Sequence, residues 1–335
     1  MRIITLSLLL CGLVIQSFGV RPPLKGYTYA SEQAPTGKEW QSPENLALNK
    51  EQPHAWFFPF QDIKSARKVL PENSIYWQSL NGNWKFNWAA DPDSRPKDFY
   101  KTDFDVTAWD TIPVPSSWNI YGVQQDGSLK YGVPIYVNQP VIFMHSVKAD
   151  DWRGGVMRTP PTNWTTYKYR NEVGSFRREF EIPEHWDRRE VFISFDGVDS
   201  FFYLWINGMY VGFSKNSRNT ANFNITNYLR SGKNIVAAEV YRNSDGSFLE
   251  AQDMFRLPGI FRTVALYSTP KVQIRDLVAT PDLDNNYTDG SLTIQADIRN
   301  FGKKTAKGYK VCYSLYANKL YSDENEPVIL ARDTK

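Results

Sequence analysis

The segment with the densest candidate chemistry runs from Asn243 to Arg262, where carboxylates alternate with turn-forming residues. It carries Asp245 next to Gly246, and Glu250 and Asp253 further along. Carboxylates in a loop can accept hydrogen bonds from sugar hydroxyls or bind a hard cation through oxygen. They can equally serve the loop itself, through local turns and pairs with arginine. The residues alone favour this second, structural interpretation.

Glu250 and Asp253 also invite comparison with the carboxylate pair of a glycosidase. Such a pair must flank the scissile bond, with its carboxyl groups about 5 Å apart for retention or about 6.5–9.5 Å apart for inversion. The sequence does not provide that separation. We therefore predict no catalytic role for either residue.

Composition excludes several other function classes. The chain of 335 residues has 39 Lys and Arg against 36 Asp and Glu, a formal net charge of +3. This balance argues against a nucleic-acid partner. Nucleotide-binding glycine loops are absent, and the three histidines lie far apart in the sequence without metal-ligand spacing (His54, His145 and His185).

Aromatic residues make up 15% of the chain. Disordered chains are poor in these residues, so the sequence predicts a folded protein. Aromatic faces stack on sugar rings, but they also fill the core of a β-sandwich. We expect most of them to be core residues.

The elements that must position the acidic loop are strands. Trp84, Phe86 and Trp88 alternate with polar residues, and the pair Asn207-Gly208 between two apolar runs predicts a tight hairpin. Short apolar runs separated by turn signals predict an all-β fold, a sandwich or barrel. The clearest runs are Val191–Phe195, Phe201–Ile206, Met209–Phe213, Ile235–Tyr241 and Phe261–Tyr267.

The strand pattern begins again after residue 269. Leu292, Ile294, Ala296 and Ile298 alternate with polar residues, which predicts a half-buried strand. An immunoglobulin-like sandwich takes roughly 100 residues and seven strands. We therefore expect residues 270–335 to be part of such a sandwich, and residues 75–269 to form the first domain.

The N-terminal residues have the pattern of a secretory signal peptide. A basic start is followed by the apolar run Ile3–Ile15, with small residues Ser17 and Gly19 before a cleavage position. We predict a signal peptide at residues 1–19, with a buried helix as the alternative, and a secreted or periplasmic location. Residues 20–74 are polar and interrupted by proline, which favours an arm over the surface. No later run approaches the ~20 apolar residues of a membrane helix.

The acidic loop resembles the segment that closes the N-terminal domain of β-galactosidases of glycoside hydrolase family 2. The resemblance covers residues 40–300, most of the chain after the signal. Further matching segments occur in the same order: Ser79–Phe86, Val114–Trp118, Pro134–Asn138, Phe195–Val198 and Leu204–Gly208.

The resemblance implies a jelly-roll sugar-binding domain, then an immunoglobulin-like sandwich, then a (β/α)₈ barrel that this chain does not reach. In the family, two barrel glutamates hydrolyse terminal β-D-galactosides with retention, and the catalytic magnesium lies there. The resemblance further implies that Asp245 and Asn138 bind galactose hydroxyls, and that Asp245 helps to hold sodium. The match at Asn138 is weaker because residues 139–142 depart from the usual continuation, and residues 144–173 resemble an insertion.

The sequence thus predicts the non-catalytic N-terminal portion of a β-galactosidase, with a β-galactoside glycan as its partner. A homo-oligomer is compatible with the full-length enzyme. The alternatives are a free-standing carbohydrate-binding module and a truncated product without function. β-Glucuronidase and β-mannosidase activity also stay open, because the barrel decides the sugar.

Overall fold

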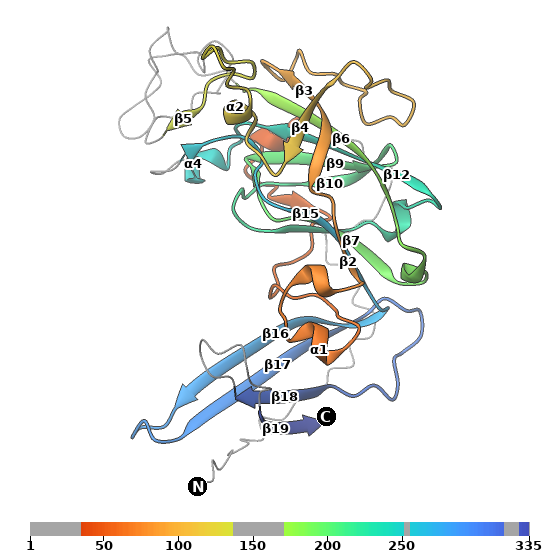
Figure 1. The fold of residues 1–335 in the computed structure, drawn as a ribbon, viewed down its shortest axis with the longest axis vertical. Helices are drawn as coiled ribbons and strands as arrows, with labels where there is room; N and C mark the ends of the chain where they lie inside the picture. The colour runs from red at the N-terminus through yellow and green to blue at the C-terminus, as the bar shows by residue number, and fades with distance from the viewer. Residues whose placement is uncertain (1–34, 137–170, 251–254, 318–327, 335) are drawn as a thin grey trace.

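The computed structural model describes residues 35–136, 171–250, 255–317 and 328–334 (Figure 1). Its main body is a sandwich of two sheets in which every strand pairing is antiparallel. The larger sheet has the order β1 (Ala47–Leu48), β10 (Met209–Ser214), β9 (Phe201–Ile206), β12 (Lys233–Tyr241), β6 (Val173–Glu181), β3 (Gly82–Ala89), β4 (Asp110–Val114). The smaller sheet has the order β11 (Ala221–Asn224), β7 (Glu190–Phe195), β15 (Val264–Thr269), β2 (Trp77–Ser79). The predicted all-β fold is confirmed.

Helical segments within the described ranges are only three or four residues long. They are η1 (Glu39–Gln41), α1 (Ile63–Ala66), η2 (Pro71–Asn73), α2 (Trp118–Tyr121), η4 (Glu184–Trp186), η5 (Thr226–Tyr228) and α4 (Ser247–Glu250). No described helix has the length and apolar character needed to cross a membrane.

The main core lies between the two sheets. Trp84, Phe86 and Trp88 of β3 all contact this core, as their alternation predicts. They face Ile193 of β7 and Leu266 of β15, which lie in the opposite sheet. Burial of these large side chains removes apolar area from water and is the main stabilising contribution to the sandwich.

The larger sheet is also buried on its outer face, which the alternation rule does not anticipate. Phe201, Tyr203 and Trp205 of β9 pack there, while the intervening residues of the strand point into the main core. Trp40 from the N-terminal segment and Phe99 from the loop between β3 and β4 cover them. All six residues of β9 are therefore buried.

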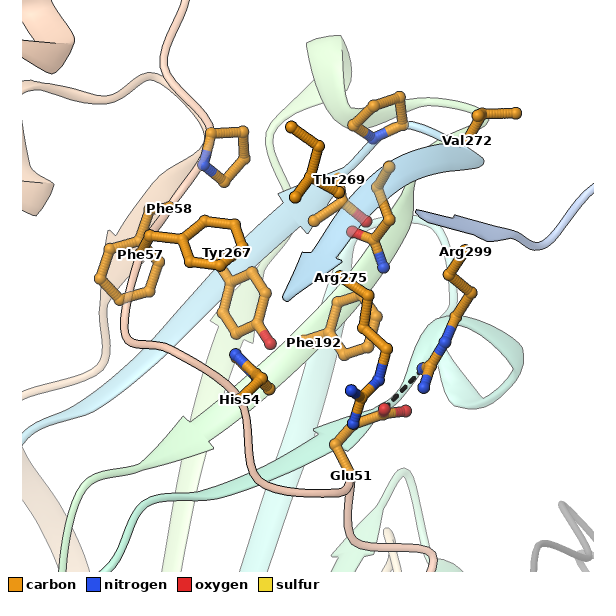
Figure 2. A pocket seen from close by; sticks show the side chains of 14 residues that line it. Glu51, His54, Phe57, Phe58, Phe192, Tyr267, Thr269, Val272, Arg275 and Arg299 are labelled. Carbon is orange, nitrogen blue, oxygen red and sulfur yellow. Dashed lines mark hydrogen bonds and ion pairs between the residues drawn. The ribbon is translucent and has the colours of Figure 1, made fainter. Parts of the chain in front are cut away.

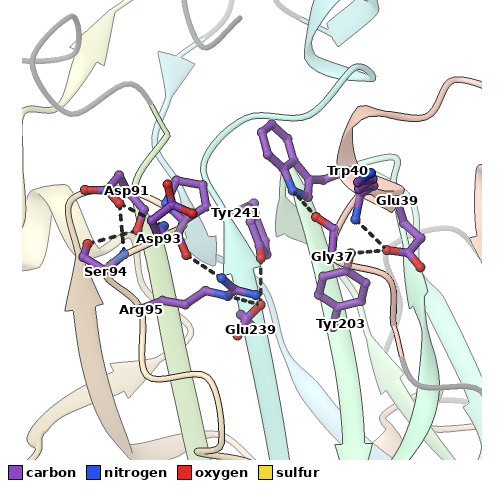
Figure 3. A network of polar contacts seen from close by, with 12 residues as sticks. Gly37, Glu39, Trp40, Asp91, Asp93, Ser94, Arg95, Tyr203, Glu239 and Tyr241 are labelled. Atoms are coloured by element: carbon purple, nitrogen blue, oxygen red, sulfur yellow. Dashed lines mark hydrogen bonds and ion pairs between the residues drawn. The ribbon is translucent and has the colours of Figure 1, made fainter. Parts of the chain in front are cut away.

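Two buried tyrosines on this outer face are paired with carboxylates (Figure 3). The Tyr203 hydroxyl donates to Glu39 at 2.5 Å, and the Tyr241 hydroxyl donates to Glu239 at 2.8 Å. Arg95 donates to the same Glu239 carboxylate at 2.9 Å. Burial raises the pKa of both tyrosines well above the ordinary value, so both hydroxyls remain donors.

The Asn207-Gly208 hairpin forms as predicted. Both residues have positive φ (53° and 80°), as a tight turn between β9 and β10 requires. The run predicted at Phe261–Tyr267 differs, because β15 begins only at Val264. Before that point the chain bonds to the Asp196-Gly197 turn, with Phe261 N donating to Gly197 O at 3.2 Å.

The N-terminal segment is built into the sandwich. Its strand β1 pairs with β10 at the edge of the larger sheet, and Glu51 N donates to Asn222 O at 2.8 Å. The close approach of β1 requires Gly212, because a Cβ there would lie 2.1 Å from Leu48 O.

After β15 the chain forms two hairpins, which lie below the sandwich in Figure 1. One pairs β16 (Val272–Leu283) with β17 (Gly290–Asn300), and the other pairs β18 (Cys312–Ala317) with β19 (Val328–Thr334). Leu292, Ile294 and Ala296 of β17 are half-buried and alternate with exposed neighbours, as predicted. The prediction is wrong at Ile298, which is 38% exposed, because the pairing with β16 shifts register opposite this residue. That this unit is immunoglobulin-like stays a prediction.

Candidate functional site

Asp245 lies in the loop that follows β12, directly before α4. The ammonium of Lys215 lies 2.8 Å from its Oδ1 and 3.0 Å from its Oδ2. Lys215 also donates to Ser42 O at 2.6 Å, and the backbone N–H of Asp245 donates to Trp40 O at 2.9 Å. Two segments distant in the sequence thus fix the carboxylate.

The two side chains of this ion pair differ in their exposure to solvent. The Lys215 side chain is 3% exposed, whereas the Asp245 side chain is 18% exposed. The cation is therefore buried behind the carboxylate, and the carboxylate retains some access to solvent. A bound sugar would meet an acceptor that is already held in place.

Asn138 lies outside the described residues, but the strand that leads to it is described. That strand, β5 (Ile135–Tyr136), pairs antiparallel with β13 (Phe255–Arg256). β13 belongs to the same loop region as Asp245. The structure therefore pairs the strand before Asn138 with a strand in the second half of the acidic loop, and the sugar contacts of Asn138 and Asp245 stay predictions.

A buried ion pair between Arg242 and Glu172 links the end of β12 to the chain that leads into β5. Arg242 Nη1 lies 2.6 Å from Glu172 Oε1, and both side chains are at most 3% exposed. Arg242 also donates to Val133 O at 2.9 Å, just before β5. Trp118 and Asn119 donate to the other oxygen of Glu172, at 3.1 and 3.2 Å. Such bonding to both partners compensates for their loss of hydration.

A second acidic pair surrounds Ser217. Glu250 accepts hydrogen bonds from the Ser217 backbone N–H at 2.8 Å and from its hydroxyl at 2.5 Å. Asp199, at the end of β8 (Val198–Asp199), lies 3.5 Å from Arg218. Burial raises the pKa of the Asp199 carboxyl to about 7; Arg218 opposes this and Glu250 reinforces it.

These contacts agree with the structural interpretation of Glu250. Both of its oxygens are bound by Ser217, so the side chain holds α4 against the turn after β10. Asp253 lies outside the described residues. The structure therefore adds nothing that favours a catalytic pair at these two positions.

The donor set around Asp245 does not by itself fit a sodium ion. The cation beside this carboxylate is the Lys215 ammonium, which already balances its charge. Over the described part of the chain, no three His, Cys, Asp or Glu side chains group as metal ligands. A sodium role for Asp245 stays a prediction that requires oxygen donors from elsewhere.

Sequence reasoning did not single out Lys215, Glu172 or Arg242. Lys215 lies 30 residues from Asp245, and Glu172 lies 70 residues from Arg242. The one available signal was the position of Arg242, directly before the acidic loop.

Residues 77–270 match the family described as "Glycosyl hydrolases family 2, sugar binding domain", which accounts for more than half of the chain. The chain belongs to glycosyl hydrolase family 2. Its relatives include a β-galactosidase of Priestia megaterium, 42% identical over 78% of this chain and 24% of that protein. Another is the β-galactosidase large subunit of Lactobacillus helveticus, 32% identical over 86% of this chain and 44% of that protein.

Solved family 2 structures share the fold at low identity. A β-glucuronidase of an uncultured Clostridium species superposes with a TM-score of 0.51 at 17% identity, over 77% of this chain and 38% of that one. The β-glucuronidase of Bifidobacterium dentium gives 0.51 at 16% identity, over 77% and 39%. Family 2 membership is therefore supported by sequence, and the sandwich fold by structure.

Proposed function

We propose that this chain is the N-terminal portion of a secreted β-galactosidase that hydrolyses terminal non-reducing β-D-galactose residues with retention. The similarity to bacterial β-galactosidases supports the galactoside substrate. The signal pattern of residues 1–19 supports secretion. The chain spans about a quarter of the Priestia megaterium relative, so the chemistry belongs to the rest of such a protein.

One observation carries the role of this portion, namely the pairing of β5, which precedes Asn138, with β13, which follows Asp245 in the acidic loop. It supports a pocket rim in which Asp245 and Asn138 bind hydroxyls of the same sugar. A carboxylate offers only acceptors and an amide offers both donors and acceptors. A ligand that lacks the matching hydroxyls would leave these groups unpaired, which favours selective binding.

Lys215 has a supporting part in this proposal. It holds the Asp245 carboxylate through an ion pair and ties it to Ser42 of the N-terminal segment. The carboxylate is thereby oriented before the sugar arrives, which lowers the entropy lost on binding.

The first test is turnover of a chromogenic β-galactoside by the purified 335-residue chain. We expect none, because the family's catalytic glutamates and magnesium lie in the barrel. If the purified chain hydrolyses the galactoside, and if the single change Asp245→Ala abolishes that activity, then the prediction that catalysis requires the barrel is wrong.

The second test uses the full-length protein that contains this portion. Asp245→Asn should raise KM, because the bound sugar loses a charged acceptor, and should lower kcat, because that contact is stronger in the transition state than in the ground state. Asp282→Asn, an exposed carboxylate in β16, is the matched control. Unchanged kinetics for Asp245→Asn would remove this residue from the site, and preference for a β-glucuronide or β-mannoside would replace the proposed sugar.

A further inference from the structure

A pocket of about 330 Å³ lies where the sandwich meets the β16–β17 hairpin (Figure 2). Its walls come from the N-terminal segment, from β7 and β15 of the smaller sheet, and from the hairpin. Small-molecule sites have volumes of about 300–1,000 Å³, so the pocket has room for one sugar ring. In Figure 1 this junction lies below the sandwich, whereas α4, next to Asp245, lies near its upper end.

One side of the pocket is aromatic. Tyr267 stacks on Phe192 with ring centroids 5.0 Å apart and an interplanar angle of 7°. Phe58 meets Tyr267 edge-on at 5.5 Å. Figure 2 shows Phe58 and Tyr267 side by side on this wall. Rigid aromatic surfaces of this kind pack against the C–H faces of a ring ligand with little loss of side-chain entropy.

The other side has buried polar atoms without a protein partner. Glu51 is 6% exposed; its Oε2 bonds to Arg299 at 2.5 Å, but its Oε1 has no hydrogen-bond partner. Thr269 is also 6% exposed, and its hydroxyl has no partner either. An unpaired buried polar group costs about 1–3 kcal/mol, so two in the lining of one pocket point to a ligand with hydroxyl groups.

The charges of the lining favour a neutral ligand. Arg299 is paired with Glu51, and Arg275 is paired with Asp297 at 3.6 Å and donates to Gln52 O at 2.9 Å. The cations are therefore compensated, and the free oxygen of Glu51 would repel an anion. That oxygen requires a donor, which an uncharged hydroxyl supplies.

We propose that this pocket binds a neutral pyranose sugar, with its apolar face on Phe58 and Tyr267 and its hydroxyls bonded to Glu51 and Thr269. The site goes beyond the proposed function, because Asp245 is not among the described residues that line it. It would give the protein a second contact with a polysaccharide or oligosaccharide.

The experiment titrates the purified chain with methyl β-D-galactopyranoside and methyl β-D-glucopyranoside, by calorimetry and saturation-transfer NMR. At least one sugar should bind in the millimolar range. Thr269→Val should weaken that binding about tenfold through one lost hydrogen bond, and Phe58→Leu should weaken it through the lost ring face. Neither change should lower the unfolding midpoint much, since the Thr269 hydroxyl has no protein partner to lose.

Asp245→Asn is the control that separates this pocket from the site of the proposed function. Binding that Thr269→Val weakens and that Asp245→Asn does not weaken belongs to the pocket, and Asp282→Asn, at an exposed carboxylate of β16 outside the pocket lining, should leave the affinity unchanged. Loss of binding in Asp245→Asn, together with normal binding in Thr269→Val, would overturn the pocket and support the rim at Asp245. Absence of saturation transfer from both sugars would also overturn the pocket, while leaving the kinetic test of Asp245 intact.

Discussion

At the scale of single residues, the rim of the sandwich is organised by charges that are buried behind the groups they hold. Lys215 lies behind the partly exposed Asp245, whereas Arg242 and Glu172 are both buried. A buried charge is tolerated only when its partner and further hydrogen bonds remain. Each of these pairs should therefore be sensitive to loss of one member.

Arg242→Met should lower the free energy of unfolding by about 3–5 kcal/mol, because it leaves the Glu172 carboxylate buried and unpaired. Urea denaturation of the purified chain measures this. Lys233→Met is the matched control: Lys233 pairs with Glu179 across the same two strands, but the two side chains are 72% and 62% exposed. That exposed pair should contribute no more than about 1 kcal/mol. Equal losses in both variants would show that burial is not decisive.

The raised pKa of Asp199 predicts a pH dependence with a definite sign. The folded pKa is about 7, against about 3.9 unfolded, so folding favours the protonated acid. Its stabilising contribution is complete below about pH 4 and is lost as the pH rises through about 7. Asp199→Asn does not titrate, so its stability relative to the wild type should increase between about pH 5 and pH 8. If the free energies of unfolding of the wild type and of Asp199→Asn change equally between about pH 5 and pH 8, this prediction is wrong.

At the scale of elements, the unusual member is the N-terminal segment. It supplies strand β1, the buried Trp40 and the carbonyls that meet Lys215 and Asp245. It therefore links the edge of the larger sheet to the candidate site. Its docking depends on the close approach at Gly212.

Gly212→Ala should displace β1, because the new methyl group would overlap Leu48 O. Hydrogen exchange followed by mass spectrometry should show faster exchange over residues 46–51, with little change in β12. Gly290→Ala is the control, since a Cβ there meets nothing closer than 3.9 Å and its φ is not in the left-handed region. Unchanged protection of β1 in Gly212→Ala would mean that the segment docks elsewhere.

These elements also show what could be predicted from the sequence. The Asn207-Gly208 turn and the shared side of Trp84, Phe86 and Trp88 follow from local rules, and the structure confirms them. The buried outer face of β9 does not, because Trp40 and Phe99 reach it from segments without periodicity. The residue that pairs with Asp245, Lys215, comes from a segment distant in the sequence, and only the fold determines that these two side chains meet.

At the scale of the whole molecule, stability is concentrated in the sandwich. Among the described residues, neither hydrophobic core contains a side chain beyond Tyr267. The hairpins contact the sandwich through polar links, such as Arg299 to Glu51 and Ala55 N to Asp276 at 2.8 Å, and through the edge-on contact of Phe301 with Phe192 at 6.2 Å. The two units should therefore differ in their ability to fold alone.

A variant ending at Pro270 should unfold in one cooperative transition, with a midpoint within a few degrees of that of the full chain. Residues 271–335 alone should be largely unfolded, because an isolated two-stranded hairpin is marginal in water. Circular dichroism during thermal unfolding tests both expectations. A shortened chain that fails to fold would show that the sandwich depends on the hairpins.

The burial of β9 on both faces bears on how this sequence can vary. In β17, exposed positions alternate with half-buried ones from Ser291 to Asp297, so every second residue there can accept a polar substitution. In β9 all six positions are buried, and none offers that freedom. In a library of single substitutions, tolerance should oscillate along β17 and stay uniformly low along β9. β9, an interior strand of the larger sheet, should thus be less free to change its sequence than β17.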